Sequence, residues 1–99
     1  MIVSAWKNDK GSFGLSISKQ DRDLYIDRKW KTVILHLDGH LSPVEANIDK
    51  SSFWKKCPHF ISTEIKDWLA KNNHISWEIR KPPKFTMSHI HSNEFKVQS

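Results

Sequence analysis

Apolar and polar side chains alternate along much of this chain, and the alternation predicts short β-strands. Phe13, Leu15 and Ile17 are separated by glycine and serine, a period of two that turns one side of a strand towards a core. We therefore expect a strand over residues 12–17. Residues 1–6 leave room for one further strand before it.

A hairpin is predicted in the middle of the chain. Residues 32–37 are rich in β-branched side chains and place three apolar residues on one face, as expected of a strand that covers a core. The Asp38-Gly39 pair that follows is a strong turn signal. Residues 44–48 then alternate again, and Pro43 is acceptable just before this second strand.

Capping residues and apolar spacing predict two helices. Ser18 is a suitable N-cap for a short helix over 19–26, and Asp21 would lie in its first turn, where an acid favours the helix dipole. From residue 61 the apolar side chains recur at intervals of three and four as far as Lys71. This second segment is the better supported helix.

The last quarter of the chain predicts three more short strands, at 75–80, around 85–87 and around 95–97, with Pro82-Pro83 as an interruption. The connections are too short for a parallel crossover between every pair of strands. We therefore expect one domain over 1–99 with an α+β fold, a mostly antiparallel β-barrel (pseudobarrel) with two short helices at its ends, and residues 98–99 as a loose tail.

Charge narrows the range of partners. Sixteen Lys and Arg against eleven Asp and Glu give a formal charge of +5, which favours a polyanion such as nucleic acid. The excess is more one-sided in 50–71 than in 19–31, where acids and bases are mixed. The longest apolar run is Val33-Ile34-Leu35, too short to span a membrane. A single cysteine favours a reducing, cytoplasmic location.

Residues 49–60, DKSSFWKKCPHF, combine aromatic side chains, lysines, a cysteine and a histidine. Cys57 and His59 there, with His89 and His91 near the end of the chain, suggest a metal site, but the paired spacings of structural zinc sites and a clear third ligand are missing. We expect no metal. Cys57 also lacks a recognisable orienting group for nucleophilic catalysis, so we expect a buried or half-buried structural thiol.

Two other kinds of chemistry are weakly supported. Asp38 and the Glu64-Ile65-Lys66 triplet resemble the acid and lysine set of a metal-dependent nuclease, but on a helix Glu64 and Lys66 would point about 200° apart. No glycine-rich phosphate loop is present, so we expect no nucleotide cofactor. Of the five tryptophans, Trp6 and Trp54 are the two expected to form exposed stacking platforms.

The order of these elements resembles the DNA-binding pseudobarrel of the plant B-three domains and of the effector domains of some type IIE restriction endonucleases. Leu15-Ser16-Ile17-Ser18-Lys19 is similar to the apolar-x-Ile-Pro-Lys opening of that family, with Ser18 in place of the proline. Residues 32–37 and 44–54 are similar to its second and third strands and the contact arm that follows. Residues 65–73 resemble its supporting W-x-x-F-x-x-x-N-x-L helix.

The resemblance implies a domain that grips the major groove of DNA with two arms. The positions that it implies for the first arm are Ser18, Lys19, Gln20 and Arg22, and for the second arm Asn47, Lys50, Ser51, Ser52, Trp54, Lys55 and Lys56. Lysine and serine suit phosphates, whereas arginine, glutamine and asparagine have the geometry that reads base edges.

The leading hypothesis is therefore a non-catalytic double-stranded DNA-binding domain, prokaryotic or phage-like in character, without cofactor or metal. Two alternatives from other classes stay open. One is a protein-interaction or inhibitor module, of phage or host-defence type, whose basic arm binds an acidic protein surface. The other is a small nuclease that uses its histidines. The pattern predicts neither the oligomeric state nor the DNA sequence recognised.

Overall fold

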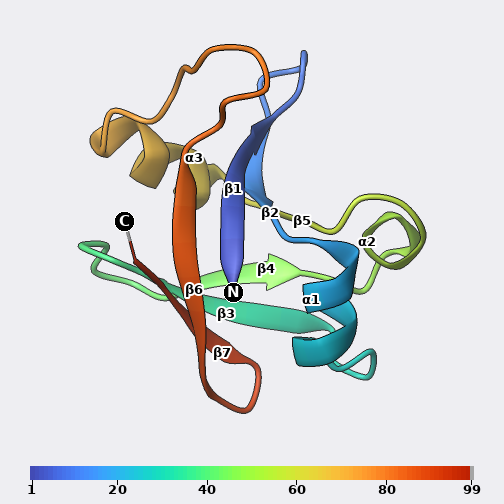
Figure 1. The fold of residues 1–99 in the computed structure, drawn as a ribbon. Coiled ribbons are helices and arrows are strands. Elements are labelled where there is room, and N and C mark those ends of the chain that lie inside the picture. Colours follow the sequence, from blue (N-terminus) through green and yellow to red (C-terminus); the bar gives the residue numbers. More distant parts are fainter. Residues whose placement is uncertain (99) are drawn as a thin grey trace.

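The chain folds into a seven-stranded sheet that curls into a nearly closed barrel, as seen in a computed structural model that describes residues 1–98 (Figure 1). The strands are β1 (Ile2–Lys7), β2 (Phe13–Ser16), β3 (Thr32–Leu37), β4 (Val44–Asn47), β5 (His59–Ile61), β6 (Lys84–His91) and β7 (Glu94–Gln98), and the helices are α1 (Lys19–Tyr25), α2 (Ser51–Lys55) and α3 (Thr63–Lys71).

The sheet is mixed, with the strand order β4-β3-β7-β6-β1-β2-β5. β3 and β7 run parallel, with Leu35 opposite Phe95, and the other five strand pairs are antiparallel. The two edge strands, β4 and β5, follow each other in the chain, and α2 is the connection between them. The open seam of the barrel is thus spanned by the segment that the sequence pattern singled out as an arm.

Alternating side chains of the strands fill the barrel. Every strand contributes at least one buried apolar residue, and Val3, Leu15, Val33, Phe60 and Phe95 have no exposed surface. This alternation is the reason why the predicted strands 12–17, 32–37 and 44–48 correspond to β2, β3 and β4, because a period of two places one face inside.

Helix α3 closes the barrel on the side away from α1 and α2 (Figure 1). Ser62 caps it, and the serine hydroxyl oxygen accepts a hydrogen bond of 3.0 Å from the backbone N–H of Glu64. Ile65, Trp68 and Leu69 form its buried face, and Trp68 Nε1 donates to the carbonyl oxygen of Asp38 at 2.7 Å. The predicted helix after residue 61 is confirmed.

The α+β class, the barrel-like sheet and the short helices are confirmed at this coarse level, whereas three details of the prediction are wrong. Residues 75–80 form no strand, and β6 pairs with β1 on one side and β7 on the other. β5 was missed, since three residues carry too little alternation. A third helix, α2, forms within the segment expected to be the contact arm, where only two helices were expected in the whole fold.

The ends of two elements also differ from expectation. α1 ends at Tyr25, one residue before its expected end, and Leu24 and Tyr25 are exposed, whereas Ile26 is buried. Gln98, expected in a loose tail, pairs with Thr86 at the end of β7, and Ser99 lies outside the described residues. No helix in the described part of the chain has the length and apolar character needed to cross a membrane.

Candidate functional site

The two predicted arms lie side by side at one side of the barrel, where α1 and α2 meet (Figure 1). The backbone N–H of Ile17, just before α1, donates to the carbonyl oxygen of Pro58, just after α2, at 3.2 Å. Arg22 of α1 then donates from Nη1 to the carbonyl oxygens of Phe53 and Trp54 in α2, at 3.0 and 2.9 Å. Segments about thirty residues apart in the chain thus form one surface.

Arg22 has a structural role at this junction. Only 7% of its surface is exposed, and its Nε donates to the carboxylate of Asp23 at 3.0 Å. The carbonyl oxygens in the last turn of a helix lack hydrogen-bond donors within the helix. Arg22 donates hydrogen bonds to two such oxygens in α2. Its guanidinium is therefore not free to read a base edge, contrary to the role expected from the sequence.

The other first-arm residues lie at the beginning of α1. The Ser18 hydroxyl oxygen accepts a hydrogen bond of 3.0 Å from the backbone N–H of Asp21, which confirms the predicted N-cap. Lys19 and Gln20 are exposed in the first turn that this cap stabilises. Their backbone is thus fixed, while their side chains extend into solvent.

Most of the second-arm residues are exposed. Ser51 and Ser52 begin α2, Lys55 ends it and Lys56 follows. Residues 50–60 contain three lysines and no acid, and none of these lysines forms an ion pair within residues 1–98. Asn47, on the exposed face of β4, uses its Oδ1 to accept a hydrogen bond of 2.9 Å from the backbone N–H of Asp49.

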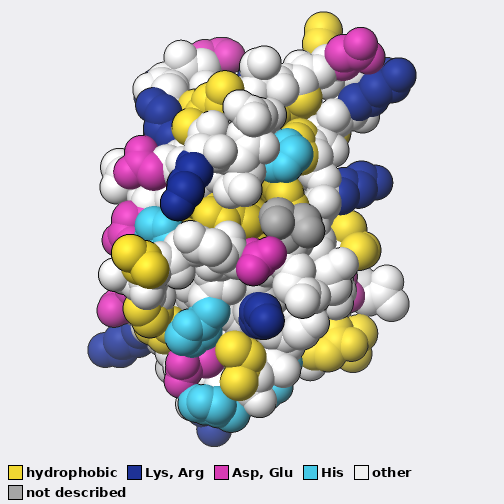
Figure 2. Space-filling model, turned by 90° about the vertical axis from the view of Figure 1, so that its left-hand side faces the viewer, with side chains coloured by type: hydrophobic (Ala, Val, Ile, Leu, Met, Phe, Trp, Pro, Cys, Tyr) yellow, Lys and Arg dark blue, Asp and Glu magenta, His cyan; other side chains and the backbone are white. Residues whose placement is uncertain are grey.

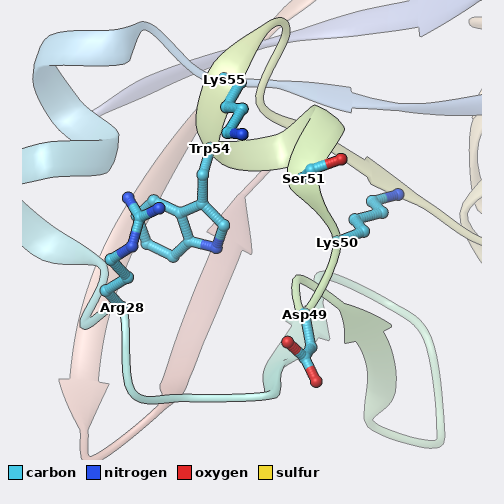
Figure 3. A pocket seen from close by; sticks show the side chains of 6 residues that line it. All are labelled: Arg28, Asp49, Lys50, Ser51, Trp54 and Lys55. Carbon is cyan, nitrogen blue, oxygen red and sulfur yellow. The ribbon is translucent and has the colours of Figure 1, made fainter.

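Trp54 is partly buried and fixed in place. Its Nε1 donates to the carbonyl oxygen of Ile48 at 2.9 Å, and its ring makes an edge contact with Phe53 at a centroid distance of 5.1 Å. The guanidinium of Arg28, from the loop between α1 and β3, lies over this ring at 5.0 Å (Figure 3). An arginine therefore already covers the platform that was expected to stack on a base.

A shallow hollow of about 270 Å³ opens beside this stack (Figure 3). Its lining consists of Arg28, Asp49, Lys50, Ser51, Trp54 and Lys55. Four of these residues were expected in the second arm, whereas Arg28 was not expected in the site. In the sequence Arg28 belongs to a segment of mixed charge, and only the packing of its loop against α2 brings it to the lysines.

On the other side of α2, Lys50 is close to a second aromatic pair. The rings of Trp6 in β1 and His59 in β5 are stacked, with centroids 4.2 Å apart and planes inclined by 29°. Partial burial and then the charge of Lys50 lower the pKa of His59, and partial burial also lowers the pKa of Lys50.

The residues considered for metal or nucleophilic chemistry do not form a common site. Residues 1–98 contain no group of three or more His, Cys, Asp and Glu side chains arranged to hold a metal. His89 and His91 are exposed and separated by an irregularity in the β6–β7 pairing. Cys57 is exposed, so the expectation of a buried or half-buried thiol is wrong, because the turn after α2 directs residue 57 outwards.

The acid and lysine triplet lies on α3, as the helical spacing predicted. Glu64 there pairs with His40 at 3.3 Å, while the Lys66 ammonium lies 5.4 Å from the centre of the Phe13 ring. The two side chains therefore have different neighbours rather than a shared metal position.

The face of the molecule away from α2 has a mixed charge. Figure 2 shows Lys and Arg side chains there interspersed with Asp, Glu and His around apolar patches. Comparison with protein-family models, curated proteins and solved structures finds no match to this chain.

Proposed function

We propose that this chain is a non-catalytic, cytoplasmic double-stranded DNA-binding domain of the B-three pseudobarrel type, which grips the major groove with two basic arms. The first arm is the beginning of α1, with Ser18, Lys19 and Gln20. The second arm runs from the end of β4 through α2, with Asn47, Lys50, Ser51, Ser52, Lys55 and Lys56 as contacts and Trp54 as its anchor.

The observation that carries this proposal is the junction between the arms. Arg22 binds the last carbonyl groups of α2 from within α1, so the two arms keep a fixed separation before any ligand arrives. Two arms that are already fixed relative to each other lose less conformational entropy when they bind a ligand. The arms expose Lys19, Lys55 and Lys56, and lysines of this kind neutralise phosphates irrespective of the base sequence.

Base recognition would fall to the amide side chains. Gln20 is exposed at the beginning of α1, and Asn47 is exposed on β4, where its Oδ1 accepts a hydrogen bond from the backbone N–H of Asp49. Asparagine and glutamine are the usual partners of adenine in the major groove. Arg22 has no part in base reading in this proposal and acts as the link between the arms.

A second candidate, an interaction module for an acidic protein surface, is favoured by one specific observation. Leu24 and Tyr25 are 68% and 47% exposed, on the same helix as Lys19 of the first arm. Apolar side chains beside a basic surface are typical of protein interfaces, whereas a DNA backbone offers them little to contact.

Titration of mixed-sequence duplex DNA at several salt concentrations tests the proposal. We expect binding at low salt that weakens steeply as salt rises, because each neutralised phosphate releases about one counterion. Backbone amide signals in NMR spectra should shift around 18–20 and 47–56. A protein that binds no duplex at low salt, but binds an acidic polypeptide through the same residues, would be the interaction module instead.

A further inference from the structure

Arg28 is a cation held in position without a charged partner. Among residues 1–98 it has no ion pair and no hydrogen bond. Its position is set by the indole of Trp54, 5.0 Å away, which Ile48 and Phe53 hold in turn. A guanidinium stacked on a ring keeps its N–H groups free at the edge, in the planar fork that matches a phosphate or carboxylate.

The hollow beside Arg28 is electrostatically suited to an anion. Arg28, Lys50 and Lys55 line it together with a single acid, Asp49. Figure 3 shows the Asp49 carboxylate well separated from the Arg28 guanidinium. The net charge of the lining is therefore positive, and the Ser51 hydroxyl adds a neutral donor.

We propose that this hollow binds one phosphate group of the DNA backbone, with Arg28 as a two-pronged donor and Lys55 as a neighbouring charge. This inference rests on the proposed function and adds to it a contact from the loop between α1 and β3. The hollow is open and about 270 Å³ in volume, so a phosphate that is part of a continuous strand can enter it from the side. A fork fixed by stacking loses little side-chain entropy on binding.

Substitution of Arg28 in the full chain tests the contact. Arg28→Ala should weaken duplex binding about five- to tenfold at low salt and reduce the slope of log affinity against log salt by about one. Arg28→Lys should keep the slope and recover only part of the affinity, because it keeps the charge without the fork. Lys29→Ala, which removes an exposed cation that does not line the hollow, should change affinity less than twofold.

A second measurement separates this inference from the proposed function. Inorganic phosphate, titrated into the protein without DNA, should shift the Arg28 Nε–H and Trp54 indole N–H signals in NMR spectra, and Arg28→Gln should abolish the indole shift while the melting temperature stays at the wild-type value. If duplex binds but Arg28→Ala behaves like Lys29→Ala, the backbone contact is wrong and the proposed function stands.

The remaining outcomes are equally decisive. If inorganic phosphate shifts both signals and no duplex binds, the proposed function fails and the hollow is a site for free phosphate groups. If neither phosphate nor duplex affects Arg28 or Trp54, the phosphate site is overturned altogether.

Discussion

Arg22 in α1 donates a hydrogen bond of 2.9 Å to the carbonyl oxygen of Trp54 in α2, and the same nitrogen donates to Phe53 at 3.0 Å. Arg22→Ala should therefore destabilise the fold by about 2–4 kcal/mol, because it removes two charge-assisted hydrogen bonds and leaves buried carbonyl groups without partners. Urea unfolding measured by tryptophan fluorescence gives this value. Lys19→Ala, an exposed neighbour in the same helix, should leave the stability unchanged, and an equal loss in both variants would contradict the linking role.

The exposed lysines of the second arm should contribute to binding without contributing to stability. The double variant Lys55→Ala/Lys56→Ala should weaken duplex binding and lower the salt slope by about two, with a change in unfolding free energy within about 0.5 kcal/mol. Lys71→Ala/Lys96→Ala removes the same charge elsewhere and should affect DNA binding much less. Collapse of the fold in the first double variant would show that these lysines are structural.

Cys57 provides a reporter at the arm. Because it is exposed and directly follows Lys55 and Lys56, a neutral maleimide should label the native protein without unfolding, and bound duplex should slow the labelling several-fold. As a control, Cys57→Ser with Ser88→Cys moves the thiol to an exposed position on β6. Labelling there should be independent of DNA. Equal rates at position 57 with and without bound duplex would place the DNA elsewhere.

His59 should make stability depend on pH. Partial burial and Lys50 lower its pKa in the folded state, so the unfolded chain binds the proton more readily and the stability that neutral His59 supports is lost as the pH falls below about 6.5. The melting temperature should thus decrease from neutral to mildly acidic pH. His59→Gln should flatten this decrease, and an unchanged profile would mean that other groups cause it.

Gly14 is required by the close approach of β2 and β5. A Cβ atom at this position would lie 2.2 Å from the carbonyl oxygen of Phe60, so Gly14→Ala must push the two strands apart. We expect a loss of about 2–4 kcal/mol in unfolding free energy. Ser16→Ala in the same strand is the control and should cost less than about 1 kcal/mol. Native stability of Gly14→Ala would show that the β2–β5 pairing is easily displaced.

Local patterns were sufficient for the elements whose buried face is decided by their own residues. The alternation around Val33 and Leu35 predicted β3, and the Ser18 cap predicted the beginning of α1, because both signals act within a few residues. Residues 75–80 show the limit of such patterns. They alternate as well as β2 does, yet they pair with no strand of the described sheet, because alternation does not determine which segments of the chain come together.

The candidate site was predictable only in part for the same reason. The run of lysines after residue 49 is visible in the sequence, whereas the different roles of Arg22 and Arg28 are not. Both are arginines in one mixed-charge segment, but Arg22 is buried and donates to the carbonyl groups of α2, whereas Arg28 is exposed and lies over the ring of Trp54. That difference depends on how two segments about thirty residues apart pack together, and no periodicity encodes it.

Within residues 1–98 the two unpaired edges of the barrel sheet are β4 and β5. Unpaired strand borders are templates on which another copy of a chain can add its own strand. Here both edge strands are short, and the eleven residues from Ile48 to Pro58 connect one to the other. Arg22 holds this connection in place through its hydrogen bonds to α2. If residues 48–58 came away from the barrel, the edges of β4 and β5 would be exposed while the core was still packed. The protein would then self-associate before it unfolded.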